Sequence, residues 1–263
     1  HWWGATADAK SGVQGGAQSL DGLLTPIFKP NRPLVLINKA LLAMKFEAIL
    51  FDCDGVLVDS EVITNSVLRD MLEANGWSMT LAECMATFVG KTVREERVVI
   101  EARTGQPLTE EWMQQFYQRR NDALVADLEI MAGAHAAVQG AHTQMQGRIA
   151  CASGADRFKV EMQLTKVGLM SFFAGRVFSG HEMARSKPAP DVYLAAARHL
   201  NVPGEQCLVI EDTTVGVTAG VAAGATVWAY CPQPEAGAAL LQAGASRLFV
   251  HMAQLPGLLA LDR

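Results

Sequence analysis

The chain has 263 residues, of which 50% are hydrophobic and 19% charged, a balance typical of a globular protein with a sizeable core. Its net charge of -5 and the lack of a basic stripe argue against nucleic acid as a partner, so we expect a small molecule instead. Five widely spaced cysteines without a CxxC pair argue against a disulfide framework or a zinc site and favour the cytoplasm.

Residues 1–43 differ in composition from the rest of the chain. They mix Gly, Ser and Ala with three prolines, and we interpret them as an extension without a fold of its own. A tail docked through residues 34–43 is the alternative. That apolar stretch is too short to span a bilayer, and the lack of a basic leader argues against a signal peptide. We therefore expect no membrane partner. Met44 is a natural start for the folded part.

Short apolar runs alternate with helical patterns from Phe46 onward. Each run has the length and content of a buried strand, and a helical segment follows it. Strands that alternate with helices predict an α/β fold with a doubly wound, Rossmann-like parallel sheet. The expected strands cover residues 46–51, 147–153, 176–179, 207–212 and 226–230.

A long segment between the first two expected strands contains helix starts but no strand-like run. Thr80 and Glu83, for example, have the spacing of a capping box. We therefore predict an α-helical cap domain at residues 61–133. It would be inserted into a catalytic core formed by residues 44–60 and 134–263.

Polar residues follow the expected strands at the edge where a parallel sheet binds ligands. Several carboxylates at one edge repel one another, and a divalent cation relieves that repulsion. An oxygen-rich shell of carboxylates suits Mg²⁺, so we expect a magnesium site. The candidates are Asp52 and Asp54 after the first strand, Ser153 and Gly154 after the second, Lys187 before the fourth, and Glu211 and Asp212 after the fourth.

Each candidate has a simpler structural explanation when it is considered alone. A lone DxD pair is commonly a turn, Ser153 could be an N-cap, and Lys187 could be a solvated lysine. Their joint occurrence, in order, at the strand ends favours a functional site. Other residues are interpreted as structural: Cys53, Cys151, Cys207, His181 and His199.

The motif DCDGVLVD at residues 52–59, Ser153, Lys187 before a proline, and the acidic pair at 211–212 resemble four ordered motifs of the haloacid dehalogenase-like hydrolase superfamily. The resemblance extends over residues 46–255. The helical insertion is similar to the cap of the phosphoglycolate phosphatase and β-phosphoglucomutase branch. The resemblance implies magnesium-dependent hydrolysis of a phosphomonoester through an aspartyl-phosphate intermediate, by a monomer or a weak dimer.

The resemblance also implies roles for single residues. Asp52 is expected to be the nucleophile that takes up the phosphoryl group, and nearby Lys187 should help to keep it ionised. Asp54 is expected to protonate the leaving oxygen and then to activate water. The groups expected to hold the phosphoryl oxygens are Ser153, Lys187 and the amides of Cys53 and Gly154. The expected Mg²⁺ ligands are Asp52, the main-chain carbonyl of Asp54, Glu211 and Asp212.

Substrate choice is expected to depend on the cap. In relatives a loop between cap helices reaches the active site, and the matching stretch is FVGKTVRE at residues 88–95. Lys91 and Arg94 could there meet an anionic or hydroxylated part of the substrate, although both also suit a solvated helix start. The string FSGHEMARSKPAPD at 178–191 resembles sugar-phosphate and sugar-acid-phosphate phosphatases, so a small substrate of that class is expected.

Two other functions compete with the phosphatase. A β-phosphoglucomutase-like phosphotransferase is disfavoured because resembling mutases carry a histidine where this chain has Thr64, and because the arginine after the cap-loop glycine is displaced to Arg94. A non-catalytic metal-dependent binding protein is less expected still. Such a protein would be expected to have lost one of the residues Asp52, Asp54, Lys187 and Asp212.

Overall fold

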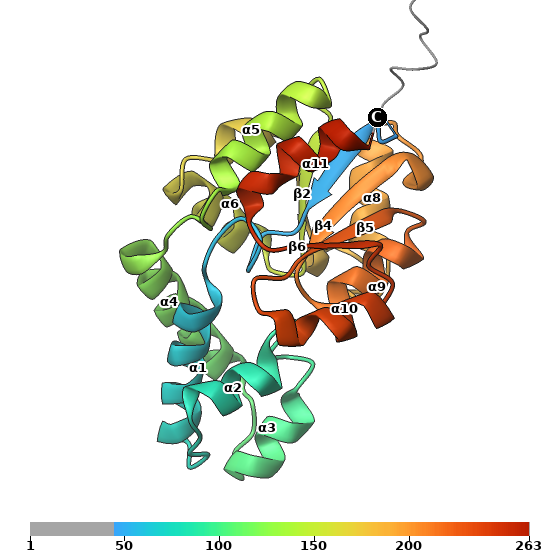
Figure 1. Ribbon diagram of the computed structural model, residues 1–263. Coiled ribbons are helices and arrows are strands. Elements are labelled where there is room, and N and C mark those ends of the chain that lie inside the picture. Colours follow the sequence, from blue (N-terminus) through green and yellow to red (C-terminus); the bar gives the residue numbers. More distant parts are fainter. Residues whose placement is uncertain (1–44, 263) are drawn as a thin grey trace, which may run out of the picture. The chain divides into compact units, whose positions relative to one another are not determined.

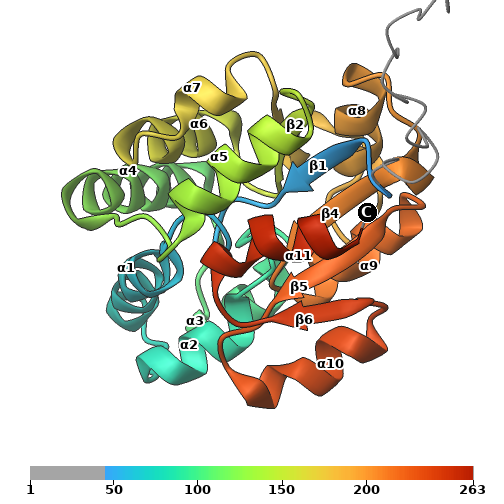
Figure 2. The ribbon, with the colours of Figure 1, turned by 45° about the horizontal axis from the view of Figure 1, so that its top comes forward.

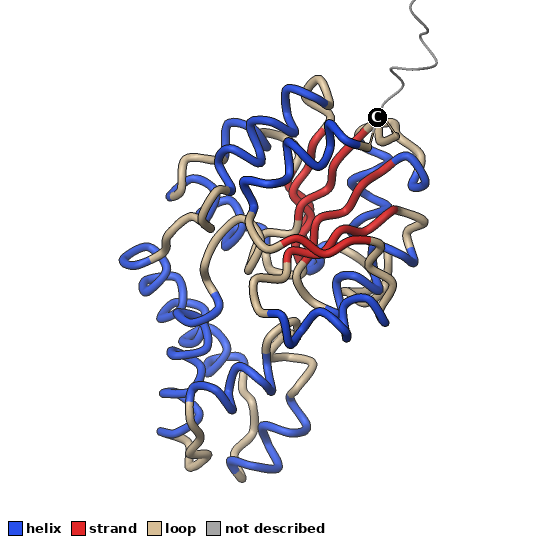
Figure 3. The backbone as a smooth tube through the Cα atoms, viewed as in Figure 1, coloured by secondary structure: helices blue, strands red, loops and turns tan. Residues whose placement is uncertain are grey.

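A computed structural model describes residues 45–262 of the chain (Figure 1). The extension expected at residues 1–43 lies outside the described residues. Within them, a parallel sheet is covered by helices on both faces (Figure 3). The predicted α/β fold with a doubly wound parallel sheet is confirmed.

The sheet has six strands in the order β3-β2-β1-β4-β5-β6, and every neighbouring pair is parallel. Five strands match the expected apolar runs. The sixth was not predicted, because a run of three residues that begins with arginine carries no strand pattern. The strands are β1 (Ala48–Phe51), β2 (Ile149–Ser153), β3 (Val177–Ser179), β4 (Cys207–Glu211), β5 (Thr226–Tyr230) and β6 (Arg247–Phe249).

Both faces of the sheet are buried. Along β1, Ile49 and Phe51 belong to one hydrophobic cluster, while Ala48 and Leu50 belong to the other. A strand that is buried on both faces needs apolar residues throughout, which explains the continuous apolar runs. The first face is covered by α5 (Ala134–Gln144), α6 (Arg157–Lys166), α7 (Met170–Phe173) and α11 (Leu255–Leu261). The second is covered by α8 (Asp191–His199), α9 (Thr214–Ala222) and α10 (Gly237–Gln242) (Figure 2).

Four helices are inserted between β1 and α5, and they share a hydrophobic cluster of their own. The predicted capping box is present, because Thr80 and Glu83 each accept a hydrogen bond from the other's main chain. The inserted helices and the sheet belong to one compact unit, so the domain boundaries at 61 and 133 stay predictions. The inserted helices are α1 (Glu61–Ala74), α2 (Leu81–Phe88), α3 (Arg97–Thr104) and α4 (Glu110–Asp127).

The five cysteines are all free and buried, as expected of packing residues. No helix between residues 45 and 262 has both the length and the apolar character needed to cross a membrane.

Candidate active site

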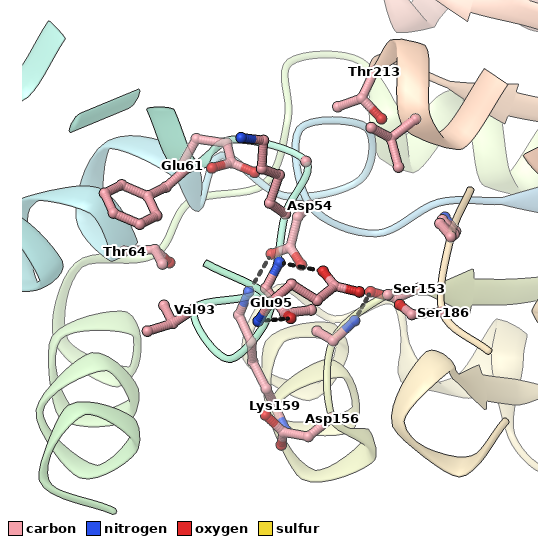
Figure 4. Close-up of a pocket in the computed structure, with 18 of the residues that line it drawn as sticks. Asp54, Glu61, Thr64, Val93, Glu95, Ser153, Asp156, Lys159, Ser186 and Thr213 are labelled. Carbon is pink, nitrogen blue, oxygen red and sulfur yellow. Dashed lines mark hydrogen bonds and ion pairs between the residues drawn. The ribbon is translucent and has the colours of Figure 1, made fainter. Parts of the chain in front are cut away.

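A cavity of about 150 Å³ is lined both by the carboxyl ends of the strands and by the inserted helices (Figure 4). Its walls come from the segments that the sequence analysis singled out. The predicted residues that line it are Asp52, Asp54, Lys91, Ser153, Gly154, Lys187 and Glu211. The predicted residues that do not line it are Cys53, Arg94 and Asp212.

Lys187 links the first and fourth strands at the base of this cavity. Its Nζ lies 2.6 Å from Asp52 Oδ1 and 2.8 Å from Glu211 Oε1, and its side chain is only 8% exposed. Tyr193 OH completes the cluster, because it donates to the same Glu211 oxygen at 2.8 Å. A buried ammonium group therefore lies between two buried carboxylates, and its removal would leave both of them without a compensating charge.

The pKa of Asp52 lies well above the ordinary value for an aspartate. Burial raises its pKa to about 7 against the opposing charge of Lys187, and the charges of Glu211 and Asp54 add to the rise. Lys187 lowers this pKa, as expected, but its charge does not outweigh the burial of Asp52. A cation close to Asp52 would add the positive charge that favours the carboxylate.

Asp54 points away from Lys187 toward α6. Three donors converge on its Oδ1: Lys159 Nζ at 2.8 Å, Gln163 Nε2 at 2.9 Å and Ser60 Oγ. Burial raises the pKa of Asp54, but the charge of Lys159 and these three hydrogen bonds outweigh it and lower the pKa to about 2. The two acids have different environments, as expected, but their pKa values lie in the reverse order.

Lys159 and Gln163 are the main site residues that the sequence analysis missed. They lie four residues apart on α6 and so share one side of the helix, which faces Asp54. A lysine in a helix is usually solvated, whereas Lys159 is 7% exposed at its side chain. The available signal was the pair of polar residues at helical spacing directly after the Ser153 motif.

A second missed contact joins the inserted helices to the core. Arg120 of α4 donates to Asp156 Oδ2 at 2.9 Å, and Asp156 Oδ1 caps α6 by accepting from Lys159 N. Arg120 also lies over the ring of Tyr117, with 4.9 Å to the centroid. His181, which was interpreted as structural, lies on the wall of the same cavity.

The loop between α2 and α3 reaches the cavity, as predicted for residues 88–95, and Lys91 and Val93 lie on its wall. Lys91 Nζ also forms an ion pair with Glu96 at 3.1 Å. Arg94 instead binds both oxygens of Glu110 at 2.8 Å, on the exposed surface. The proposed substrate contact of Arg94 thus has no support from its position, because the guanidinium group already has a carboxylate partner.

The expected phosphate-binding groups lie at the end of β2. Ser153 is 1% exposed, and its Oγ accepts a hydrogen bond from Ala155 N at 3.0 Å. The hydroxyl hydrogen of Ser153 remains available for an anion, and Gly154 lines the cavity beside it. Cys53 is buried, with its Sγ 3.7 Å from Gln163 Oε1. The phosphate contacts of Ser153, Lys187, Gly154 and Cys53 stay predictions.

The carboxylates at this sheet edge suit a divalent cation. One oxygen each of Asp52, Glu211 and Asp212 lies within 4.8 Å of the others. Asp212 Oδ1 is buried and has no hydrogen-bond partner among residues 45–262. Gly55, at φ +75°, makes room for Asp212, since a Cβ there would lie 2.0 Å from Asp212 Oδ2. A buried carboxylate oxygen without a hydrogen-bond donor fits the role of a metal ligand.

Glu211 differs from the other predicted metal ligands, because both its oxygens already accept hydrogen bonds. Oε1 accepts from Lys187 and Tyr193, and Oε2 accepts from Thr213 N and Thr213 Oγ1. The backbone of Asp212 donates to Oε2 as well. This geometry suits a residue that holds Lys187 and the 211–213 loop in place. Asp54 lies outside the carboxylate cluster, and its main-chain carbonyl as a ligand stays a prediction.

Gly216 is required by the buried position of Glu211. A Cβ at Gly216 would lie 1.7 Å from Glu211 Oε1, so we expect Gly216→Ala to displace Glu211 and weaken its contact with Lys187. Overpacking of this kind costs about 1 to 3 kcal/mol of unfolding free energy, and activity should fall with it. Urea denaturation and activity assays measure the two effects. Gly257→Ala in α11 is the control, because its Cβ would meet no atom within 4 Å. Equal stability of the two variants would contradict the prediction.

The comparisons with known proteins agree with this geometry. The family model for haloacid dehalogenase-like hydrolases matches residues 46–224. The chain is 28% identical over 215 residues to 6-phosphogluconate phosphatase of Escherichia coli, and the alignment covers 81% of this chain and 95% of that protein. It is 28% identical over 204 residues to a phosphorylated carbohydrates phosphatase of Thermotoga maritima, with 77% and 93% covered.

A solved structure is similar in fold as well as in sequence. A hydrolase of the same family from Deinococcus radiodurans, with bound phosphate and sodium, aligns with a TM-score of 0.67 at 30% identity. The alignment covers 83% of this chain and 97% of that one. The family match spans more than half of the sequence and includes the first strand, the cavity wall and the 211–212 pair. The chain therefore belongs to the haloacid dehalogenase-like hydrolases.

Proposed function

We propose that this hydrolase removes the phosphoryl group from a small sugar phosphate or sugar-acid phosphate, with Asp52 as the nucleophile. Membership of the family and the two relatives named as phosphatases support phosphatase activity. The observation that carries the assignment of Asp52 is its position. It lies at the base of the cavity, 2.6 Å from a buried lysine and beside Asp212.

The chemistry follows from two acids on opposite sides of the reacting phosphorus. An oxygen of Asp52 forms a bond to phosphorus while the ester P–O bond breaks, and Asp54 gives a proton to the leaving oxygen. This step requires the negative charge of the bound ester to raise the pKa of Asp54 from about 2, so that its carboxyl group is protonated. Asp54 then takes a proton from water, which attacks the phosphorus of the aspartyl phosphate. Inorganic phosphate leaves and the Asp52 carboxylate is regenerated. Lys187 offsets the negative charge of the transferring group.

The contacts of Asp54 support different tasks for its two oxygens. Oδ1 accepts from Lys159, Gln163 and Ser60, so its lone pairs are engaged. Oδ2 is then the oxygen that exchanges the proton with the leaving group and with water. Lys159 and Gln163 act as positioning residues, since they hold the carboxylate in one orientation.

The residues at this edge would hold Mg²⁺ through Asp52, Asp212 and the main-chain carbonyl of Asp54. The unpaired Asp212 Oδ1 supports this assignment. When bound, Mg²⁺ supplies positive charge that polarises the phosphoryl oxygens. Glu211 would support the site through Lys187 and the loop amides instead of binding the cation directly.

Metal removal tests this assignment. We expect the purified protein to hydrolyse 4-nitrophenyl phosphate with Mg²⁺, to lose that activity in EDTA and to regain it when Mg²⁺ is added in excess. Mg²⁺ should also raise the melting temperature of the wild type, because a ligand that binds the folded state stabilises it. Asp212→Asn should reduce this shift. Activity that persists after exhaustive chelation would contradict the magnesium assignment.

A product assay with sugar phosphates shows whether water or a sugar accepts the phosphoryl group. With β-glucose 1-phosphate and glucose 1,6-bisphosphate, a phosphatase releases inorganic phosphate and needs no bisphosphate activator. Accumulation of glucose 6-phosphate much faster than free phosphate would indicate the mutase instead. Failure of the protein to turn over any ester, with Mg²⁺ supplied, would favour a binding protein.

A further inference from the structure

The first helix of the cap, α1, presents three side chains to the cavity. Glu61, Thr64 and Leu68 all line it, and their spacings of three and four residues place them on one side of the helix. Figure 4 draws Glu61 and Thr64 among the residues that line the cavity, together with Asp54. The phosphoryl transfer described above uses none of the three.

Thr64 carries a hydroxyl group that lacks a partner. Its Oγ1 is buried and forms no hydrogen bond among residues 45–262. A helical threonine commonly donates to the carbonyl four residues earlier, as Thr87 does to Glu83 O at 2.8 Å. A buried hydroxyl without a partner costs free energy, so a ligand atom that bonds to Thr64 Oγ1 would be favoured.

Glu61 supplies a complementary polar atom one helical turn away. Asn65 Nδ2 donates to Glu61 Oε2 at 3.1 Å and to the Glu61 carbonyl at 2.8 Å, which orients the side chain. No described side chain donates to Glu61 Oε1. A ligand hydroxyl both donates and accepts, so it can bond to Glu61 and to Thr64 at the same time.

We propose that Thr64 and Glu61 bind a hydroxyl group on the leaving group of the substrate, so that the enzyme acts on polyol phosphates. This inference rests on the proposed phosphatase function. Asp54 protonates the leaving oxygen, and so the carbon chain that departs lies beside α1. Phe88 and Val93 line the same cavity and limit the water that could replace a missing hydroxyl. A site of this kind discriminates against an ester that leaves its polar groups unpaired.

Three phosphate esters and three variants test the proposal. Erythritol 4-phosphate and n-butyl phosphate share a four-carbon chain and differ in hydroxyl groups, while 4-nitrophenyl phosphate reports the chemistry alone. Thr64→Val keeps the shape and removes the hydroxyl, and Thr64→Ser restores it. Thr87→Val is the matched control, because Thr87 lies on α2 outside the cavity and bonds to its own helix.

We expect the wild type to prefer erythritol 4-phosphate over n-butyl phosphate in kcat/KM by at least about tenfold. Thr64→Val should reduce kcat/KM for the polyol ester by roughly 3- to 10-fold more than for the other two esters. Thr64→Ser should recover most of that difference, and Thr87→Val should show none.

Two results overturn the proposal while leaving the phosphatase assignment intact. One is a wild type that hydrolyses the aryl ester but does not distinguish the polyol ester from the alkyl ester. The other is a Thr64→Val variant that loses activity equally on all three esters, which would indicate a structural role. If the wild type hydrolyses none of the three with Mg²⁺, the phosphatase function fails and this inference fails with it.

Discussion

Asp52→Asn is expected to lower the hydrolysis of 4-nitrophenyl phosphate by at least about 10,000-fold, because the amide keeps the shape of the side chain but cannot attack phosphorus. Lys187 can still donate to the remaining Oδ1, so phosphate esters should still bind. Initial rates over a range of enzyme concentrations measure the loss, and product inhibition by inorganic phosphate measures binding.

The stability of this variant separates a chemical effect from misfolding. Burial raises the pKa of Asp52 to about 7, so above that pH the wild type must keep a carboxylate in an environment that disfavours the charge. The neutral amide avoids this cost, and the melting temperature of Asp52→Asn in EDTA should equal or exceed that of the wild type. Asp70→Asn on α1 is the matched control, because Asp70 is 62% exposed and pairs with Arg69 away from the cavity. Activity of Asp52→Asn close to that of Asp70→Asn would disprove the nucleophile assignment.

Lys187→Met should have the second largest effect, on activity and stability together. Its removal leaves Asp52 and Glu211 as two close, buried carboxylates without a cation between them. Breaking a buried ion pair of this kind costs about 3 to 5 kcal/mol of unfolding free energy. Catalysis should also fall by a factor on the order of 1,000 or more, because the charge that offsets the transferring phosphoryl group is lost.

Urea denaturation in EDTA measures the loss of unfolding free energy in Lys187→Met without a contribution from added metal. Lys45→Met provides the comparison, because Lys45 is 56% exposed and pairs with Asp262 at 3.6 Å, a surface contact of little consequence. If the two variants were equally stable and equally active, Lys187 would not hold the first and fourth strands together as described.

The arrangement of the core follows from features that a sequence displays directly. A parallel strand buried on both faces must be apolar along its whole length, and β1, β2, β4 and β5 carry that pattern. Parallel strands end at a common edge, so residues that follow those runs had to meet there. The convergence of Asp52, Ser153, Lys187 and Glu211 on one cavity was therefore predictable. β6 was not, because its three residues form no pattern.

The partners of individual side chains were not predictable in the same way. Arg94 pairs with Glu110 of the helix α4. Arg120, which belongs to no recognisable motif, joins α4 to Asp156. Lys159 would be read as a solvated helical lysine, yet it is buried against Asp54. Each contact depends on how the inserted helices pack on the core, and their spacing along the chain does not encode that packing.

The sheet, the inserted helices and the edge where the acids gather could therefore be predicted from the sequence alone, because strand and helix periodicities and strand-end positions are local properties. The three-dimensional arrangement was needed to show which carboxylate oxygens are free to bind a cation or exchange a proton, and how strongly the environment favours the ionised form of each acid. Glu211 is saturated by hydrogen bonds, Asp212 Oδ1 has none within residues 45–262, and Asp54 Oδ1 has three donors. Burial and neighbouring charge depend on distances between segments far apart in the chain, and these set the pKa of Asp52 above that of Asp54.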